Sequence, residues 1–424
     1  MEFHDLPSLA IVAIAGLTAF GLLVRPFRWP EAVWAVSAAV VIVLAGLLPW
    51  PAALAGIARG MDVYLFLIGM MLISDIARKE GLFDWLAAIA TAHAKGSPQR
   101  LFVLIYLVGV LVTVFMSNDA TAVVLTPAVY AACKAARVRD PFPYMLICAF
   151  IANAASFVLP ISNPANLVIF SGGHMPALGT WFSMFALPSA VSIIVTFVTL
   201  YLTQRRAIAE DSIAADVAGV PLGHGAKIAG FGLIATAIAL LAASALDIDL
   251  GWPTFVAGLA TLALVSVFNR ENPVGYMREI SWSVLPLVAG LFVVVEALGQ
   301  TGMIQTLAAT LNAHADADPK ATAMAAGLVT GFVANVVNNL PAGLVAGSVV
   351  QAAQTSPAIS AAVLIGIDLG PNLSISGSLA TILWINALRR EGIDVGFWRF
   401  LKIGFVVMVP ALVATLASVA LAAV

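Results

Sequence analysis

Three acidic residues lie within apolar stretches of this chain, where a charge is costly: Asp119, Glu296 and Asp368. An ionised carboxylate near the middle of a bilayer costs about 2.5–3.5 kcal/mol on insertion scales, so such groups persist mainly where a proton or substrate pathway uses them. Glu296 stands near the end of its apolar run and is expected to be wet. Asp119 and Asp368 are therefore the predicted proton-coupling groups, with Asp119 as the main carrier.

Around these acids lie four clusters of uncharged hydrogen-bonding residues, at 117–121, 153–166, 338–341 and 368–378. Proline and glycine interrupt the helix in these clusters and free backbone amides and carbonyls. The interrupting residues are Pro160, Pro164, Pro341, Gly370, Pro371 and Gly377. Hydrogen bonds between helices would explain one isolated asparagine, but four clusters favour a binding site. The predicted substrate-binding residues are Asn118, Thr121, Ser162, Asn163, Asn339, Asn372, Ser376 and Ser378.

The composition requires lipid as the solvent for most of the chain. Of the 424 residues, 62% are hydrophobic and 10% charged, and the mean hydropathy is +1.03. At about 20 apolar residues per crossing, roughly ten membrane helices fit. The apolar run 9–24 has no small-residue cleavage site after it and predicts a membrane helix rather than a signal peptide. A net charge of -2 without a basic stripe gives no sign of nucleic-acid binding.

An internal repeat organises the sequence. Three landmarks recur in the second half at one constant offset, Gly69 as Gly290, Gly81 as Gly302 and Asn118 as Asn339. Further along, 161–163 align with 375–377 at a shorter offset. Two apolar runs, 101–133 and 320–353, are too long for one crossing and are interrupted by polar residues, so each predicts a re-entrant hairpin.

The predicted fold is an all-α polytopic membrane protein with about ten transmembrane helices in two inverted repeats. Each repeat contains a re-entrant hairpin and a broken helix. The predicted first half is 1–203, with its hairpin at 101–133 and its broken helix at 143–171; the second is 228–424, with its hairpin at 320–353 and its broken helix at 357–386. A cytoplasmic linker, 204–227, joins the two halves.

Basic residues predict opposite orientations for the two halves. Lys134, Arg137 and Arg139 follow the first hairpin, whereas the corresponding joint at 351–355 has no cation. The positive-inside rule then places the chain in the cell inner membrane with both termini in the periplasm. Twelve full crossings, with both hairpins spanning the membrane, are the alternative and preserve most of this charge asymmetry.

The polar clusters resemble those of the arsenite efflux pumps of the ArsB type. These pumps belong to the ion-transporter superfamily that also holds the NhaD sodium/proton antiporters and the dicarboxylate carriers. The resemblance covers roughly residues 8–423, and it rests on the motifs at 117–121 with 125–127, at 338–341, and from 368–371 to 377–384. The last of these motifs is the one most specific to arsenical pumps.

The resemblance implies efflux of arsenite and antimonite from the cytoplasm, driven by inward proton flow. In some members a soluble ATPase docks on the cytoplasmic face. No cofactor and no metal ion are implied. Enterobacterial members have an acid at the position of Asn153 and a lysine at that of Asn372. If those two charges form a pair, losing both together is electrostatically neutral.

A sodium/proton antiporter of the same superfamily is the main alternative, because Asp119 and Asp368 with nearby amide and hydroxyl oxygens also suit a hard cation. An enzyme is not expected, since the chain has neither a His-Glu-x-x-His nor a Gly-x-Ser-x-Gly pattern. The two cysteines, Cys133 and Cys148, are too few for a three-coordinate thiolate site.

Overall fold

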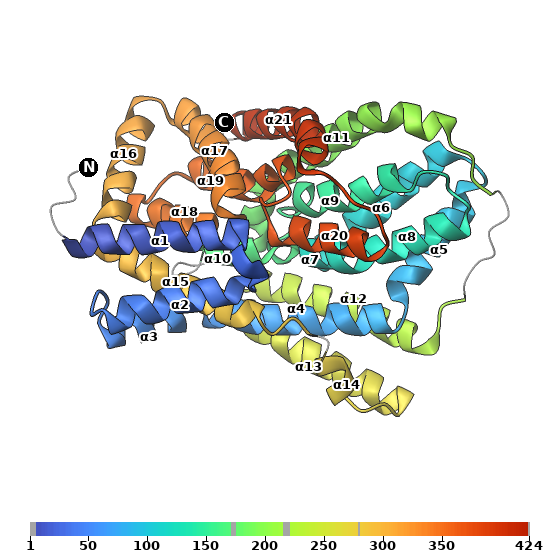
Figure 1. Ribbon diagram of the computed structural model, residues 1–424, viewed down its shortest axis with the longest axis horizontal. Helices are drawn as coiled ribbons and strands as arrows, with labels where there is room; N and C mark the ends of the chain where they lie inside the picture. Colours follow the sequence, from blue (N-terminus) through green and yellow to red (C-terminus); the bar gives the residue numbers. More distant parts are fainter. Residues whose placement is uncertain (1–5, 171–174, 215–220, 279, 423–424) are drawn as a thin grey trace.

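A computed structural model describes residues 6–170, 175–214, 221–278 and 280–422, and this part of the chain is helical without any strand (Figure 1). The first half comprises α1 (Leu6–Val24), α2 (Glu31–Leu44), α3 (Trp50–Arg59), α4 (Met61–Lys79), α5 (Leu82–Ala94), α6 (Pro98–Phe115), α7 (Asn118–Ala120), the π-helical turn η2 (Thr121–Leu125), α8 (Thr126–Ala135), α9 (Phe142–Ala154), α10 (Pro164–Phe170) and α11 (Leu178–Glu210). Short 3-10 turns, η1 (Pro26–Arg28) and η3 (Pro160–Ser162), separate some of them.

The second half follows the same order of elements. It comprises α12 (His224–Ala245), α13 (Gly251–Asn269), α14 (Val274–Met277), α15 (Val284–Gln300), α16 (Met303–Ala317), α17 (Pro319–Val337), α18 (Asn339–Ala353), α19 (Pro357–Leu369), the 3-10 turn η4 (Gly370–Leu373), α20 (Leu379–Arg390) and α21 (Phe397–Ala422).

Helix length and composition fit a protein that crosses a membrane many times. Among the described residues, seven helices are long and apolar enough to span, and two bent pairs raise the number to nine. The bent pairs are α3 with α4, at 45°, and α15 with α16, at 73°. Shorter apolar helices, including α9 and α19, accompany them. The prediction of an all-helical polytopic membrane protein is confirmed.

Glycines permit close contacts between helices of the two halves. Gly69 on α4 lies against the backbone of Thr254 on α13, and Gly290 on α15 lies against the backbone of Ala35 on α2, so a β-carbon at either glycine would collide with main chain. Gly258 of α13 in turn faces Gly69. The repeat thus produces two equivalent crossings, α4 on α13 and α2 on α15 (Figure 1). In each of them a helix of one half packs on a helix of the other.

The second pair of repeated glycines, Gly81 and Gly302, is required by backbone conformation rather than by close packing. Gly81 and Gly302 have φ angles of +76° and +75°, and they directly precede α5 and α16. Glycine adopts this left-handed conformation without the steric cost that a β-carbon brings. The repeat therefore preserves a sharp turn at the same place in both halves.

Each half contains a helical hairpin with a polar tip. In the first, α6 ends at Phe115 and α7 begins at Asn118, and the Ser117 Oγ accepts the backbone N–H of Ala120 at 3.1 Å. In the second, Asn338 separates α17 from α18 with φ +76°, and its Oδ1 accepts the backbone N–H of Leu340 at 3.3 Å. Both returning helices are therefore capped by a side chain at the tip.

The broken helices repeat with one constant spacing of their own. Helix α19 begins as many residues after the start of α9 as α20 begins after the start of α10. The offset that aligns 161–163 with 375–377 is therefore one residue smaller than the offset between the helices themselves. Each broken helix contacts the hairpin of the opposite half, since α10 packs on α18 and α20 packs on η2 and α8.

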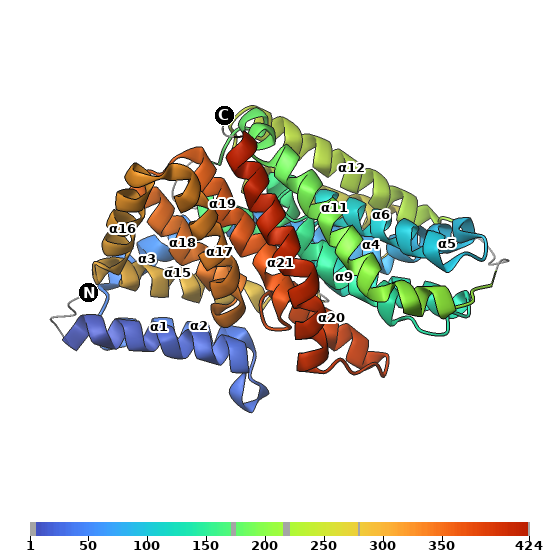
Figure 2. The same cartoon turned by 90° about the horizontal axis from the view of Figure 1, so that it is seen from above.

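The last helices of the two halves, α11 and α21, pack along each other (Figure 2). Helix α11 continues to Glu210 and α12 begins at His224, while 215–220 lie outside the described residues. The division of the chain at a linker, 204–227, stays a prediction.

The glycine crossings predict a specific loss of stability. Replacing Gly69→Val or Gly290→Val inserts a branched side chain against backbone and should lower the free energy of unfolding by about 1–3 kcal/mol. The measurement is the melting temperature of the purified protein in detergent. Gly16→Val on α1 is the matched control, because a β-carbon there meets no atom within 4 Å. Equal melting temperatures for all three variants would contradict the packing described here.

Candidate functional site

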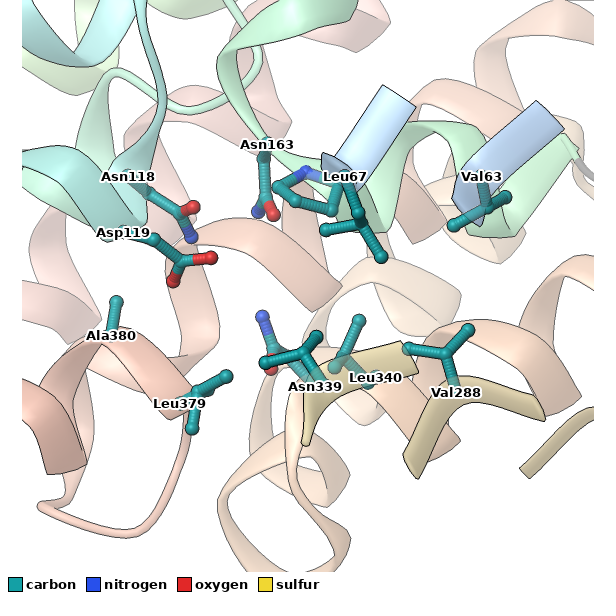
Figure 3. A pocket seen from close by; sticks show the side chains of 12 residues that line it. Val63, Leu67, Asn118, Asp119, Asn163, Val288, Asn339, Leu340, Leu379 and Ala380 are labelled. Carbon is teal, nitrogen blue, oxygen red and sulfur yellow. The ribbon is translucent and has the colours of Figure 1, made fainter. Parts of the chain in front are cut away.

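A small cavity lies where six helices meet (Figure 3). Its walls come from α4, α7, α15, α18, α20 and the start of α10. The lining residues are Val63, Leu67, Asn118, Asp119, Asn163, Pro164, Val284, Val288, Asn339, Leu340, Leu379 and Ala380. The cavity volume is about 20 Å³, which is room for about one water.

Equivalent positions of the two halves line the cavity. Its lining contains four pairs with the same offset as the repeated glycines, namely Val63 with Val284, Leu67 with Val288, Asn118 with Asn339 and Asp119 with Leu340. Pro164 and Leu379, the first residues of α10 and α20, form a fifth pair. Only one pair places a charge opposite an apolar residue, so Asp119 makes this otherwise symmetric site chemically one-sided.

The amides of the two hairpin tips lack a full set of partners. Asn118 is 2% exposed and Asn339 is 3% exposed, and the Oδ1 atom of each accepts no hydrogen bond from the described residues. Leaving a buried polar atom unpaired costs about 1–3 kcal/mol. Figure 3 shows both amides, that of Asn163 and the carboxylate of Asp119 around the same space. The oxygens of Asn118 and Asn339 are thus available as hydrogen-bond acceptors for a ligand.

Four helices begin at the cavity, because the lining includes the first residues of all four, namely Asn118 of α7, Pro164 of α10, Asn339 of α18 and Leu379 of α20. Asn163 Oδ1 accepts the backbone N–H of Ala165 at 3.0 Å, and Ser378 Oγ accepts that of Thr381 at 3.1 Å. Helix N-termini carry partial positive charge. The four helix starts therefore attract negative charge to the cavity.

The two predicted proton-coupling acids have different surroundings. Asp119 is half-buried, and no donor among the described residues contacts its carboxylate. Asp368 is fully buried at the end of α19; its Oδ2 lies 2.7 Å from Ser156 Oγ, and its Oδ1 accepts from Asn163 Nδ2 at 2.8 Å. Asp368 does not line the cavity, but Asn163 connects it to the cavity wall.

Asn153 and Asn372, the two positions at which the resemblance implies charged residues, contact each other. Asn153 Nδ2 donates to Asn372 Oδ1 at 3.0 Å, and Asn372 Nδ2 donates to the Phe150 carbonyl at 2.9 Å. An amide pair therefore stands where the resemblance implies opposite charges. Asn153 and Asp368 are also as far apart along the chain as the starts of α9 and α19, so the two residues occupy equivalent positions in the two broken helices.

The other predicted substrate-binding residues are engaged in local hydrogen bonds. Thr121 Oγ1 contacts Thr113 Oγ1 at 2.8 Å, and Ser162 Oγ donates to the Val114 carbonyl at 2.9 Å. Ser376 lies 3.3 Å from Ser374 Oγ, while Ser378 caps α20. Of the eight predicted residues, only Asn118, Asn163 and Asn339 line the cavity. The binding roles of all eight stay predictions.

The sequence analysis did not identify the apolar walls. Val63, Leu67, Val284 and Val288 look like ordinary core residues, and a search for polar groups passes over them. The constant offset between the repeated glycines could have revealed these walls, because the same offset relates α4 to α15 and one hairpin tip to the other. Cys133 and Cys148 are buried on α8 and α9 and do not line the cavity.

Known proteins place this architecture among membrane transporters. The profile of the CitMHS family, described as citrate transporter, matches residues 20–369. An uncharacterized transporter of Mycobacterium bovis is 26% identical, with 86% of this chain and 85% of that protein covered. An arsenical pump membrane protein of Escherichia coli is 29% identical, with 84% and 85% covered.

A solved structure supports the fold independently. The crystal structure of the Alcanivorax borkumensis YdaH transporter superimposes with a TM-score of 0.60 over 98% of both chains, at 14% sequence identity. An identity this low speaks for the fold alone. Since the family profile covers well over half of its length, the chain belongs to the CitMHS citrate transporter family and is a membrane transporter.

Proposed function

We propose that this transporter exports arsenite and antimonite across the inner membrane by proton-coupled antiport with alternating access. The observation that carries the proposal is the central cavity, in which unpaired amide groups and a single carboxylate face one another between aliphatic walls. The name of the Escherichia coli relative, arsenical pump membrane protein, points in the same direction.

The cavity chemistry suits a small neutral oxyacid. At neutral pH arsenite is uncharged and carries hydroxyl groups, so the free amide oxygens of Asn118 and Asn339 can accept its protons. The cavity in this conformation holds about one water. Arsenite is larger, and binding therefore requires the walls to separate, as the alternation between inward and outward states would allow.

Citrate is disfavoured by the same geometry, although it gives the family its description. None of the described residues that line the cavity is Lys, Arg or His, so no cation is available to pair with carboxylates. The four helix starts attract anions, but Asp119 offsets their charge. A multiply charged anion beside Asp119 would also be repelled in a site largely closed to water.

Asp119 is proposed as the main proton carrier, with Asp368 as the second. Asp119 reaches the cavity, and its repeat counterpart is Leu340, which cannot titrate. A proton on Asp119 when substrate is bound, and a charge when the site is empty, would link the two fluxes.

A sodium/proton antiporter remains the second candidate, because a specific observation favours it. The unpaired oxygens of Asn118 and Asn339, together with the Asp119 carboxylate, are the hard ligands that small cations prefer. Sodium in place of arsenite in the assays below distinguishes the two functions.

Asp119→Asn should preserve folding and abolish transport driven by a pH gradient, because the amide keeps the size of the side chain but cannot carry a proton. Asp119→Glu should retain part of the activity with a shifted pH optimum. The measurement is arsenite uptake into everted membrane vesicles over a range of pH. Wild-type rates in Asp119→Asn would transfer the proton role to Asp368 or out of the protein.

Removing either tip amide should weaken arsenite transport. Asn118→Ala and Asn339→Ala each delete one acceptor, and a lost hydrogen bond of this kind is expected to raise KM about ten-fold. Asn312→Ala on α16 is the matched control, since that residue lies outside the cavity. An unchanged KM for arsenite with a raised KM for sodium would favour the antiporter.

The proposed orientation places 134–139 and 389–399 in the cytoplasm, where a soluble ATPase could dock, and 351–357 and both termini in the periplasm. Single cysteines introduced into a Cys133→Ser, Cys148→Ser background should label accordingly with a membrane-impermeant thiol reagent. Cysteines at 134–139 and 351–357 are expected to react from opposite sides. Reaction of both from one side would reject the inverted arrangement.

A further inference from the structure

The hydroxyl of Ser156 lies between two oxygen atoms at short range. Its Oγ is 2.7 Å from the Asn153 carbonyl oxygen and 2.7 Å from Asp368 Oδ2. A serine hydroxyl has one proton to donate, and a carbonyl oxygen can only accept. The Ser156 hydroxyl therefore donates its proton to the Asn153 carbonyl oxygen. The contact between Ser156 Oγ and Asp368 Oδ2 is then a hydrogen bond only if Asp368 donates, which requires a proton on Oδ2. The Ser156 backbone N–H also approaches that carbonyl, but at 3.4 Å it does not account for the short hydroxyl contact.

The hydrogen bond at the other carboxyl oxygen, Oδ1, is consistent with a protonated Asp368. Asp368 Oδ1 accepts from Asn163 Nδ2 at 2.8 Å. The backbone N–H of Ala165 donates to Asn163 Oδ1 at 3.0 Å, which fixes the direction of that amide. With a proton on Oδ2, each of these short distances joins one donor to one acceptor.

The surroundings offer no charge to pair with an ionised Asp368. Its helix, α19, packs on α9, α10, α11, α17, α18 and α21. The titratable residues on those helices are Tyr144, Cys148, Tyr201, Arg205, Arg206, Glu210, Lys320, Arg399 and Lys402. None of them forms a hydrogen bond or ion pair with Asp368 in the described part of the chain. The other acid at the site, Asp119, lines the cavity together with Asn163. A fully buried charge without a partner is strongly unfavourable, and a proton removes that cost.

We infer that Asp368 holds a proton on Oδ2 in this conformation, and that Ser156 is a positioning residue that relays this state to the end of α9. When the Oδ2–H bond breaks and the proton leaves to water, the Ser156 hydroxyl turns its own proton to the carboxylate. The Asn153 carbonyl then loses its hydroxyl donor. Loading and unloading of Asp368 thus change hydrogen bonding in the broken helix of the opposite half. Only the use of this proton for export rests on the proposed function.

Infrared spectroscopy of the purified full-length protein tests the location of the proton. The carbonyl stretching band of a protonated carboxylic acid should be present in the wild type, lost in Asp368→Asn and retained in Asp119→Asn. The asparagine can donate to Ser156 and accept from Asn163, so this variant is expected to fold. A band that survives in Asp368→Asn would overturn the inference.

Ser156 variants test the relay. Ser156→Ala should move the band to higher frequency, because the acid proton loses its acceptor, and Ser156→Thr should restore the wild-type position. A band unchanged in Ser156→Ala would reject the relay, and this comparison decides the question even if Asp368→Asn does not fold. Because the measurement needs no substrate, a failure of arsenite transport leaves its result intact.

Discussion

Backbone groups at membrane depth must find hydrogen-bond partners within the protein, because lipid offers none. The two broken helices expose carbonyl groups, and side chains provide the donors. Asn166 Nδ2 contacts the carbonyls of Ser156, Leu159 and Pro160, and Trp181 Nε1 contacts those of Phe157 and Val158. In the second half, Asn335 Nδ2 donates to the Gly331 and Gly370 carbonyls. Many asparagines near the site are thus committed to holding its irregular backbone, and this sets which amides remain free for a ligand.

The repeat was visible in the sequence because backbone geometry enforced it. Gly69 and Gly290 permit close helix crossings, and Gly81 and Gly302 adopt left-handed φ angles, so other residue types would be strained at these positions. The hairpin tips were visible for a similar reason, since polar residues at membrane depth stand out against apolar neighbours. These features made the fold class predictable.

The composition of the cavity was harder to predict. Residue type does not show whether an asparagine faces a ligand or its own backbone, as the nearby Asn163 and Asn166 illustrate. Apolar wall residues such as Val63 carry no chemical signature. The alignment of the broken helices was one position off, because Ile-Ser matches in both halves while the helix caps, Asn163 and Ser378, follow the longer spacing of the helices themselves.

Duplication of the fold did not extend to the charges. Asp119 stands opposite Leu340, and Asp368 stands opposite Asn153, so each half contributes one acid whose counterpart is neutral. The two halves therefore have equivalent backbones but different charges.

The reciprocal crossings also constrain how the protein is made. Helices α2 and α4 are synthesised well before α15 and α13, on which they pack at Ala35 and Gly69. During translation the N-terminal half must wait in the bilayer with these two faces covered only by lipid or chaperone. Each of these helices has its most extensive contact with a helix of the other half, so assembly is completed only after the second half has been inserted. The helices that are made last therefore determine when α2 and α4 reach their final positions.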